Sequence, residues 1–184
     1  MTDGEIRRVS SRTVYENAWM AVREDEIERP DGSRGVYGVV DKPDFALVVP
    51  MERGGFHLVE EYRYPLGRRT WNFPQGSAPG RAAVPPAELA RRELAEETGL
   101  RADALTELGR LDSSHGTTGQ GVTVFLATGL RAGAHDREPE EQEMRQCWIT
   151  RAEFKRMIRD GRITDDSTVA AYALLLLHEE EGGV

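Results

Sequence analysis

The chain has 184 residues, with 32 acidic and 24 basic side chains and a formal net charge of −8 at neutral pH. This length suits one domain with a sizeable core, residues 1–184, and the acidic balance argues against a surface dedicated to nucleic acid or anionic membranes. A single cysteine, Cys147, excludes an internal disulfide. The polar start Met1–Ser10 shows no secretory signal, and the apolar run Ala170–Leu177 is too short to span a bilayer, so we expect a cytoplasmic protein without a membrane segment.

The first forty or so residues have the pattern of antiparallel strands. Alternating side chains predict strands over Arg12–Trp19, Met20–Arg29 and Gly35–Asp41. Pro30–Gly32 lies between the second and third of these runs and is a turn signal. The second and third strands are therefore expected to form a β-hairpin.

The middle of the chain predicts a strand pair followed by a helix. Phe45–Met51 is a buried strand, Arg53–Gly55 a turn, and Phe56–Tyr62 the partner strand. Pro86 is tolerated in a first helical turn, and Gly99 is a typical C-terminal cap. We expect the helix to fill the interval between these two residues.

Two further strands and two helices follow. The strands are predicted over Leu105–Asp112 and Gly121–Leu130, joined by a glycine-rich loop. Thr150, with a glutamate three residues later, predicts a capping box for a helix that ends at Gly161. Asp165 or its neighbour begins the last helix.

Three carboxylates of the first predicted helix share one face. Glu93, Glu96 and Glu97 stand at i, i+3 and i+4, where like charges repel, and the last two lie near the helix C-terminus, which disfavours anions. A divalent cation removes both penalties, and Mg²⁺ or Mn²⁺ prefers such hard oxygen ligands. The alternative is a solvated face with ion pairs; it accounts for Glu88 beside Arg92 but not for Glu93 facing Glu97.

This segment carries a resemblance to a known family. The run 92–100 matches every fixed position in the second half of the Nudix box, and Trp71–Gly76 resembles the strand and turn before it. The resemblance implies an α+β fold, an α/β/α sandwich with a mixed sheet. It also implies metal-dependent hydrolysis of a nucleoside diphosphate linked to another group. The matching residues are Arg92, Glu93, Leu94, Glu96, Glu97, Gly99 and Leu100.

The first half of the box departs from the family pattern. The interval between Gly76 and Arg92 is two residues longer than the pattern, and its early glutamate is replaced by Ala82 or Val84, depending on the direction of counting. Residues 77–84 contain no carboxylate. The rigidity of this loop and full metal occupancy are therefore in question.

Flanking segments are similar to the ADP-ribose pyrophosphatase-like branch of the family. The hairpin Val22–Val40 resembles its N-terminal β extension, which implies an extension over about 1–42, a core over about 43–184, and a homodimer. The strand Val59–Pro65 resembles one that ends in a substrate-binding arginine, here Arg63. The acidic run 138–144 matches the loop that carries a catalytic glutamate, and the turn at 161–165 resembles the branch's C-terminal turn.

Roles follow from the box and its flanks. Glu93 and Glu97 are expected to hold the metal, with Glu96 as a further ligand and backbone carbonyls near Gln75 completing the shell. Arg92 is expected to orient a box carboxylate. The general base is expected in the acidic loop, at Glu141, with Glu140 and Glu143 as neighbouring candidates.

Three residues are candidate substrate contacts. Arg63 is expected to contact phosphate or a terminal ribose, although a packed surface arginine is the alternative. Gly76 would let the ligand approach the backbone. Trp71 would stack on a base, although a tryptophan at a strand start is more often part of the core.

These expectations converge on a Mg²⁺-dependent hydrolase of ADP-ribose or a similar nucleotide sugar, giving a nucleoside monophosphate and a sugar phosphate. One alternative is a diadenosine polyphosphate or RNA 5′-pyrophosphate hydrolase, because Phe73–Gly76 resembles the turn of those enzymes. The acidic surface argues against an RNA substrate. A second alternative is a catalytically weak nucleotide-binding sensor, suggested by the missing loop glutamate.

Overall fold

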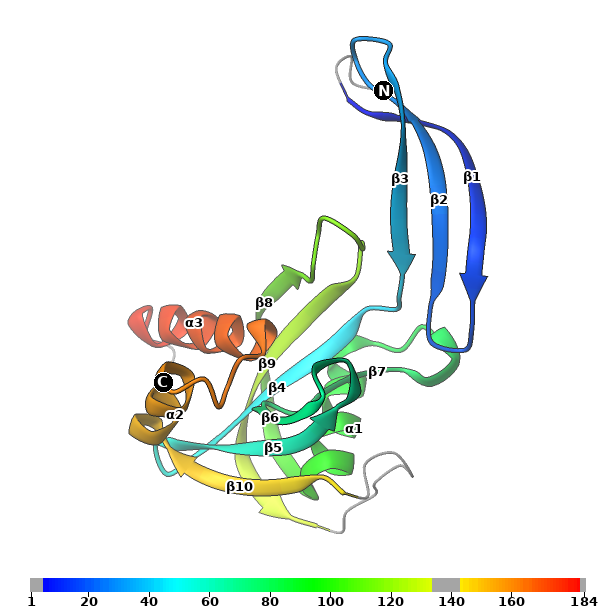
Figure 1. Ribbon diagram of the computed structural model, residues 1–184. Coiled ribbons are helices and arrows are strands. Elements are labelled where there is room, and N and C mark those ends of the chain that lie inside the picture. Colours follow the sequence, from blue (N-terminus) through cyan, green and yellow to red (C-terminus); the bar gives the residue numbers. More distant parts are fainter. Residues whose placement is uncertain (1–4, 134–142, 183–184) are drawn as a thin grey trace.

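A computed structural model describes residues 5–133 and 143–182 (Figure 1). An antiparallel three-stranded sheet, in the order β1-β2-β3, projects from the main body of the molecule. Its strands are β1 (Arg7–Glu16), β2 (Ala21–Glu28) and β3 (Arg34–Asp41). The predicted hairpin of the second and third strands is confirmed.

The first predicted strand was placed too far along the chain. β1 ends at Glu16 because the side-chain oxygen of Asn17 accepts hydrogen bonds from the backbone N–H groups of Trp19 and Met20, at 2.9 and 2.8 Å. The Asn17 N–H also donates to the Met20 carbonyl oxygen, which closes a tight turn. Trp19 therefore lies in the β1–β2 turn, not in a strand.

The larger sheet is mixed, as the resemblance implied. Its strands run in the order β10-β5-β4-β9-β8, with β6 paired to β5 and β7 to β4; the β4–β9 pair is parallel and the others are antiparallel. The strands are β4 (Phe45–Glu52), β5 (Gly55–Arg63), β6 (Arg68–Asn72), β7 (Gln75–Ser77), β8 (Leu100–Asp112), β9 (Gly121–Ala132) and β10 (Arg145–Thr150).

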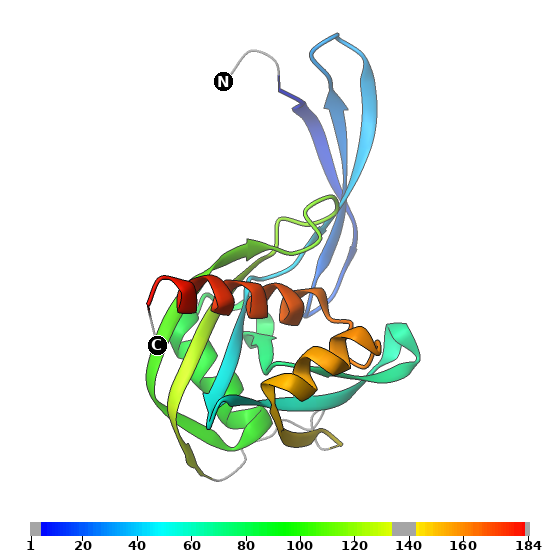
Figure 2. The same ribbon diagram turned by 90° about the vertical axis from the view of Figure 1, so that its left-hand side faces the viewer.

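Helices cover both faces of this sheet (Figures 1 and 2). They are α1 (Pro86–Thr98), α2 (Arg151–Arg159) and α3 (Asp166–Glu180); two short 3₁₀ turns span Tyr64–Leu66 and Pro79–Arg81. Successive residues of β4 point to opposite faces. Leu47 and Val49 pack in a cluster with α2 and α3, while Ala46 and Val48 pack in a second cluster with α1.

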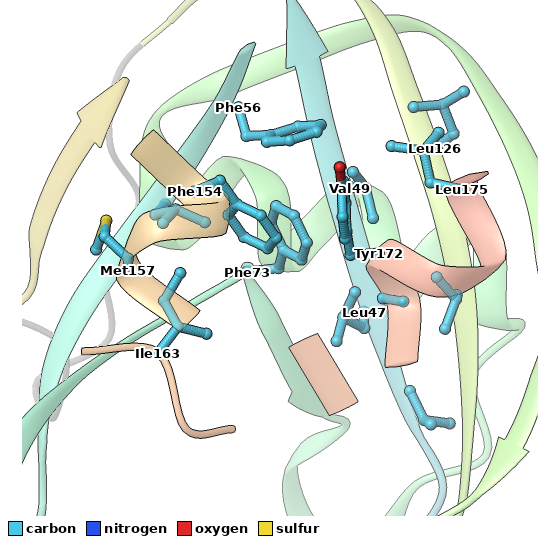
Figure 3. Close-up of a cluster of buried hydrophobic side chains, with 14 residues drawn as sticks. Leu47, Val49, Phe56, Phe73, Leu126, Phe154, Met157, Ile163, Tyr172 and Leu175 are labelled. Carbon is cyan, nitrogen blue, oxygen red and sulfur yellow. The ribbon is translucent and has the colours of Figure 1, made fainter. Parts of the chain in front are cut away.

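Aromatic rings fill the cluster between the sheet and the helices α2 and α3 (Figure 3). The Phe56 ring meets Phe73, Phe154 and Tyr172 edge-on, with centroid separations of 5.5, 5.1 and 5.9 Å. Phe73 and Phe154 stack at 5.1 Å. Phe73 lies two residues before β7, so its packing brings the chain to the position where β7 pairs with β4.

Several element boundaries differ from the sequence expectation. β8 begins at Leu100, directly after the Gly99 cap, and the sequence predicts no bounds for β10. Thr150 caps α2 by accepting from the Glu153 N–H, but the Glu153 carboxylate pairs with arginines instead of returning to the cap. In the part of the chain that the structure describes, no helix combines the length and apolarity needed to cross a bilayer.

Candidate functional site

Helix α1 turns its carboxylates toward the sheet. Glu93 and Glu97 are only 5% and 3% exposed, so the alternative of a solvated face does not hold for them. A Cβ atom added to Gly76 in β7 would lie 2.4 Å from Glu93 Oε2, so glycine is what allows this carboxylate to lie against β7. Gly99 ends α1 in the left-handed conformation, with φ of 68°, as the sequence predicts.

Arg92 lies beside two of the box carboxylates. Its guanidinium nitrogens are 3.7 Å from a Glu93 oxygen and 3.5 Å from a Glu96 oxygen. The Arg92 side chain is about one-third exposed, at 35%, and borders the same cavity as the glutamates. This position suits a residue that orients carboxylates.

A cavity of about 340 Å³, here called the acidic cavity, collects the acidic side chains. The sequence predicts most of the residues that line this cavity as site residues. It does not predict Trp19, in the β1–β2 turn, or the strand residue Glu61. Met144, the last residue of the acidic run, also lines it. Its lining includes Trp19, Glu61, Arg63, Gln75, Gly76, Ser77, Arg92, Glu93, Glu96, Glu97 and Met144.

A second cavity of about 290 Å³, here called the polar cavity, lies against the same short strand. Gln75, Gly76 and Ser77 line both cavities. Arg63 lines both and also a third cavity, of about 340 Å³, beside Leu66. The arginine that the resemblance singled out therefore stands at the junction of three cavities.

Glu61 holds Arg63 in place at this junction. Its Oε1 lies 2.7 Å from the guanidinium of Arg63 and accepts a 3.5 Å hydrogen bond from the Asn72 amide. Burial raises the pKa of the Glu61 carboxyl, while the positive charge of Arg63 opposes that rise. Glu61 therefore faces Arg63 from a largely desolvated position.

Gln75 connects β7 to the start of α3. Its side-chain amide donates to Asp165 Oδ2 at 3.0 Å, and the same oxygen caps α3 by accepting from the Thr168 N–H at 2.8 Å. The Gln75 side chain thus joins β7 to the N-terminal cap of α3.

The remaining predicted residues lie elsewhere. Trp71 packs against the aromatic cluster and its backbone N–H donates to the Arg162 carbonyl oxygen, while the linings of the three cavities do not include it. The Glu143 side chain is 92% exposed, and its backbone carbonyl oxygen accepts from Arg69 at 2.6 Å. Glu140 and Glu141 lie outside the described residues.

The loop without its expected glutamate is supported by apolar packing. Ala78, 5% exposed, and Val84 join the cluster around Leu89 and Leu94 of α1. Pro79–Arg81 forms a 3₁₀ turn between them. Apolar packing therefore holds this loop in place. In the family that the sequence resembles, a carboxylate is expected to do so.

The donor set of the acidic cavity fits a hard divalent cation. It offers carboxylate oxygens from Glu93, Glu96 and Glu97 beside the backbone of Gly76. Within residues 5–133 and 143–182, no three His, Cys, Asp or Glu side chains converge as a ready-made ligand group. Mg²⁺ commonly takes only one or two carboxylates and completes its shell with water and substrate phosphates, so a cavity wall that offers separate carboxylates is compatible with it.

Comparisons with known proteins extend over nearly the whole chain. A profile of the nucleoside diphosphate sugar hydrolase N-terminal domain matches residues 6–40, and a profile of the NUDIX domain matches residues 41–172. An ADP-ribose pyrophosphatase of Mycobacterium tuberculosis (strain ATCC 25618 / H37Rv) is 34% identical over 172 residues, covering 92% of this chain and 83% of that protein.

More distant relatives share the same extent. An ADP-ribose pyrophosphatase of Bacillus subtilis (strain 168) is 26% identical, and a methanol dehydrogenase activator of Bacillus methanolicus is 25% identical, each over 95% of both chains. The crystal structure of an ADP compounds hydrolase superposes with a TM-score of 0.84, over 100% of both chains at 22% identity. This last likeness shows a shared fold.

Proposed function

The chain belongs to the NUDIX family of pyrophosphohydrolases, and from that premise we propose that it cleaves the pyrophosphate of a nucleoside diphosphate sugar, ADP-ribose or a close relative. The products would be a nucleoside monophosphate and a sugar phosphate. The observation that carries the proposal is the place of Arg63, at the junction of three cavities and on the lining shared with the buried glutamates. Relatives named as ADP-ribose pyrophosphatases support this choice of substrate.

Arg63 would bind the pyrophosphate. A guanidinium presents a planar fork of donors that matches phosphate oxygens, and Glu61 at 2.7 Å limits its rotation. The Arg63 side chain is 41% exposed, so it is open to a ligand while one side remains held. Arg63 and Gln75–Ser77 line the same two cavities, so phosphates bound to Arg63 would lie beside this strand.

Glu93 and Glu97 would hold Mg²⁺ or Mn²⁺, with Glu96 and the backbone near Gln75 as further donors. When bound, such a cation neutralises phosphate oxygens and lowers the pKa of a bound water. Arg92, within 3.7 Å of Glu93 and 3.5 Å of Glu96, would orient these carboxylates.

A carboxylate of the acidic run would accept the proton from the attacking water. Glu141 is our first candidate, with Glu140 and Glu143 beside it. Support comes from Met144, because it is 8% exposed and lines the acidic cavity. The acidic run therefore ends beside the acidic cavity.

The test is a panel of ADP-ribose, ADP-glucose, diadenosine tetraphosphate and 5′-triphosphorylated RNA, assayed with Mg²⁺ and with Mn²⁺. We expect the highest kcat/KM for a nucleotide sugar, with the two monophosphates as products. Preferred cleavage of diadenosine tetraphosphate or RNA would contradict the substrate class. Tight binding of ADP-ribose without turnover under either metal would indicate a sensor instead.

A further inference from the structure

We propose that Arg69 of β6 is a positioning residue for the hydrolysis, because it holds the main chain near the end of the acidic run against β5. This inference rests on the proposed function and deepens it. The Arg69 guanidinium donates to the Glu143 carbonyl oxygen at 2.6 Å. Arg69 is not among the described residues that line the three cavities, so we expect it to act on the reaction through Glu143 and its neighbour Met144.

Arg69 is itself oriented by two oxygens of one residue in β5. Its Nε donates to Glu60 Oε2 and its Nη2 to the Glu60 carbonyl oxygen, each at 3.1 Å. The Arg69 and Glu60 side chains are 25% and 16% exposed, so these contacts are largely shielded from water. A guanidinium presents its donors in a rigid fork, and Nη2 carries two protons. With Glu60 fixing the fork, the remaining Nη2 proton is directed at the Glu143 carbonyl oxygen.

The Arg69 side chain spans β5 from one edge to the other. Glu60 pairs with Trp71 of β6 on one edge of β5 and with Arg145 of β10 on the opposite edge. Glu143 lies two residues before β10 begins. An arginine from the strand on one edge therefore holds the segment that leads into the strand on the other edge, and it joins β6, β5 and β10 in a single contact.

The segment held by Arg69 leads directly to the lining of the acidic cavity. Met144 follows Glu143, is 8% exposed and lines this cavity together with the box glutamates. Glu143 is one of the candidate bases, and its carboxylate lies 3.9 Å from the Arg69 guanidinium. Glu141, our first candidate, stands two positions earlier in the sequence, and two residues of chain span about 7 Å at most. Fixing the Glu143 main chain therefore limits where a carboxylate of this run can meet the attacking water.

The hairpin that carries Arg69 also carries the residue proposed to bind the pyrophosphate. Arg63 ends β5, and Arg69 lies in β6 after the 3₁₀ turn Tyr64–Leu66. The Gly67 N–H donates to the Arg63 carbonyl oxygen at 3.1 Å, and Arg63 pairs with Arg68 across the hairpin. One hairpin therefore holds both arginines, so it would fix the bound pyrophosphate relative to the anchored end of the acidic run.

Arg69→Met tests the anchor, because methionine keeps an unbranched stem and removes the donors. We expect kcat for ADP-ribose with Mg²⁺ to fall about tenfold to a hundredfold, as for a misplaced catalytic group, while KM stays within about twofold. Amide hydrogen exchange at Glu143 and Met144 should become faster, since their main chain loses a support. Arg69→Lys should recover only part of kcat, because an ammonium keeps the charge but lacks the planar fork that reaches all three acceptors.

Arg145→Met is the matched control and should change neither kcat nor the exchange. Arg145 contacts the same Glu60 carboxylate, at 3.4 Å, but its side chain is 71% exposed. Thermal unfolding would be recorded for every variant. If Arg69→Met does not fold, Arg69→Lys decides alone, since the inference requires its kcat to be below that of the wild type.

Four results would overturn the inference. Unchanged kcat in Arg69→Met would show that the anchor does not serve the reaction, and a raised KM at unchanged kcat would make Arg69 a substrate contact. Full recovery in Arg69→Lys would assign the effect to charge alone. Equal losses in Arg69→Met and Arg145→Met would indicate a general loosening of β10. In each case wild-type turnover of ADP-ribose still supports the proposed function; absence of that turnover removes both.

Discussion

At the scale of single residues, Glu97 is both buried and one of the carboxylates proposed to hold the metal. The Glu97 side chain is 3% exposed, so burying its charge has a cost in desolvation free energy. Replacing it with the neutral isostere glutamine should therefore not lower the free energy of unfolding. We expect Glu97→Gln to lower kcat by about a hundredfold or more, because a metal-binding oxygen becomes an amide. Steady-state kinetics with Mg²⁺ and thermal unfolding would measure the two effects.

The control for that variant is Glu88→Gln. Glu88 lies in the first turn of the same helix and is exposed, so its charge is solvated. Its removal should leave kcat unchanged. Full activity in Glu97→Gln would mean that the metal site has been misplaced.

Gly76 is a second residue at which one added atom matters. Gly76→Ala places a methyl group 2.4 Å from Glu93 Oε2, so the carboxylate or the strand must move. We expect a loss of activity together with about 1–3 kcal/mol of folding free energy, typical of overpacking. Gly38→Ala, whose added Cβ would meet nothing within 4 Å, should show neither effect in urea unfolding and kinetic assays. Equal effects in the two variants would contradict the steric argument.

The contrast between Glu97 and Trp19 shows which site residues a sequence can reveal. Glu97 belongs to a helix, where the spacing of residues on one face is regular. The glutamates one and four positions before it therefore indicate an acidic cluster on that face. Trp19 reaches the acidic cavity from a turn in the extension, and no local pattern connects it with residues more than seventy positions later. Asp165 and Lys42 were missed as cavity residues for the same reason, since only the tertiary fold brings them beside β7.

At the scale of elements, boundaries were predicted best where backbone chemistry is specific. Pro86 and Gly99 delimit α1 as expected, because one residue fits a first turn and the other a left-handed cap. The predicted start of β8 lies five residues too late, because Leu100 follows the cap directly and no turn residue marks the beginning of the strand. β7 spans only three residues and is positioned by its pairing with β4. Because the two strands are separated in the sequence, no short segment of sequence reveals this contact.

The two helices on one face of the sheet are joined by an ion pair that should respond to pH. Arg151 of α2 contacts both carboxylate oxygens of Glu179 of α3, at 2.6 and 2.5 Å, and its guanidinium also lies 5.4 Å from the Phe56 ring centre. Hydrogen bonds from Arg151 lower the pKa of Glu179 below its usual 4.5. A lowered carboxyl pKa stabilises the fold above about pH 4.5, and this contribution is lost as the pH falls through the lowered value.

Glu179→Gln should therefore cost about 1–2 kcal/mol of unfolding free energy at pH 7. The difference from wild type should shrink steadily below pH 4.5, as the wild-type carboxyl takes up its proton. Urea unfolding at a series of pH values would measure it. Glu180→Gln, at the exposed neighbouring position, serves as the control. A difference that persisted at the lowest pH would show that the pair acts through packing and not through charge.

At the scale of the whole molecule, the projecting β1-β2-β3 sheet leaves apolar side chains in solvent. Val36 is 63% exposed, Tyr15 53% and Val14 49%, and none of them belongs to either core cluster. Such a face on an arm that the main body does not cover favours association with a second copy. The homodimer implied by the resemblance therefore remains our expectation.

Sedimentation or light scattering should give twice the chain mass of 20.6 kDa. Val36→Lys should shift the protein toward the monomer, because a charge in a buried interface loses its hydration. Glu26→Lys, at an exposed position of the central strand, is a useful comparison because it also adds a lysine but removes no apolar contact. A wild-type protein that is monomeric at micromolar concentration would contradict this expectation.

The bonds between β3 and the loop at 113–120 have a consequence for how such an enzyme can change over time. Tyr37 donates its hydroxyl proton to the Gly116 carbonyl oxygen at 2.8 Å, from the same strand that exposes Val36. The Val40 N–H of this strand also donates to the Thr117 carbonyl oxygen at 2.8 Å. β3 therefore both exposes apolar side chains and holds the loop that forms one wall of the polar cavity. Mutations that alter one of these two surfaces of β3 also affect the other. We therefore expect oligomeric state and substrate range to change together as proteins evolve from this chain.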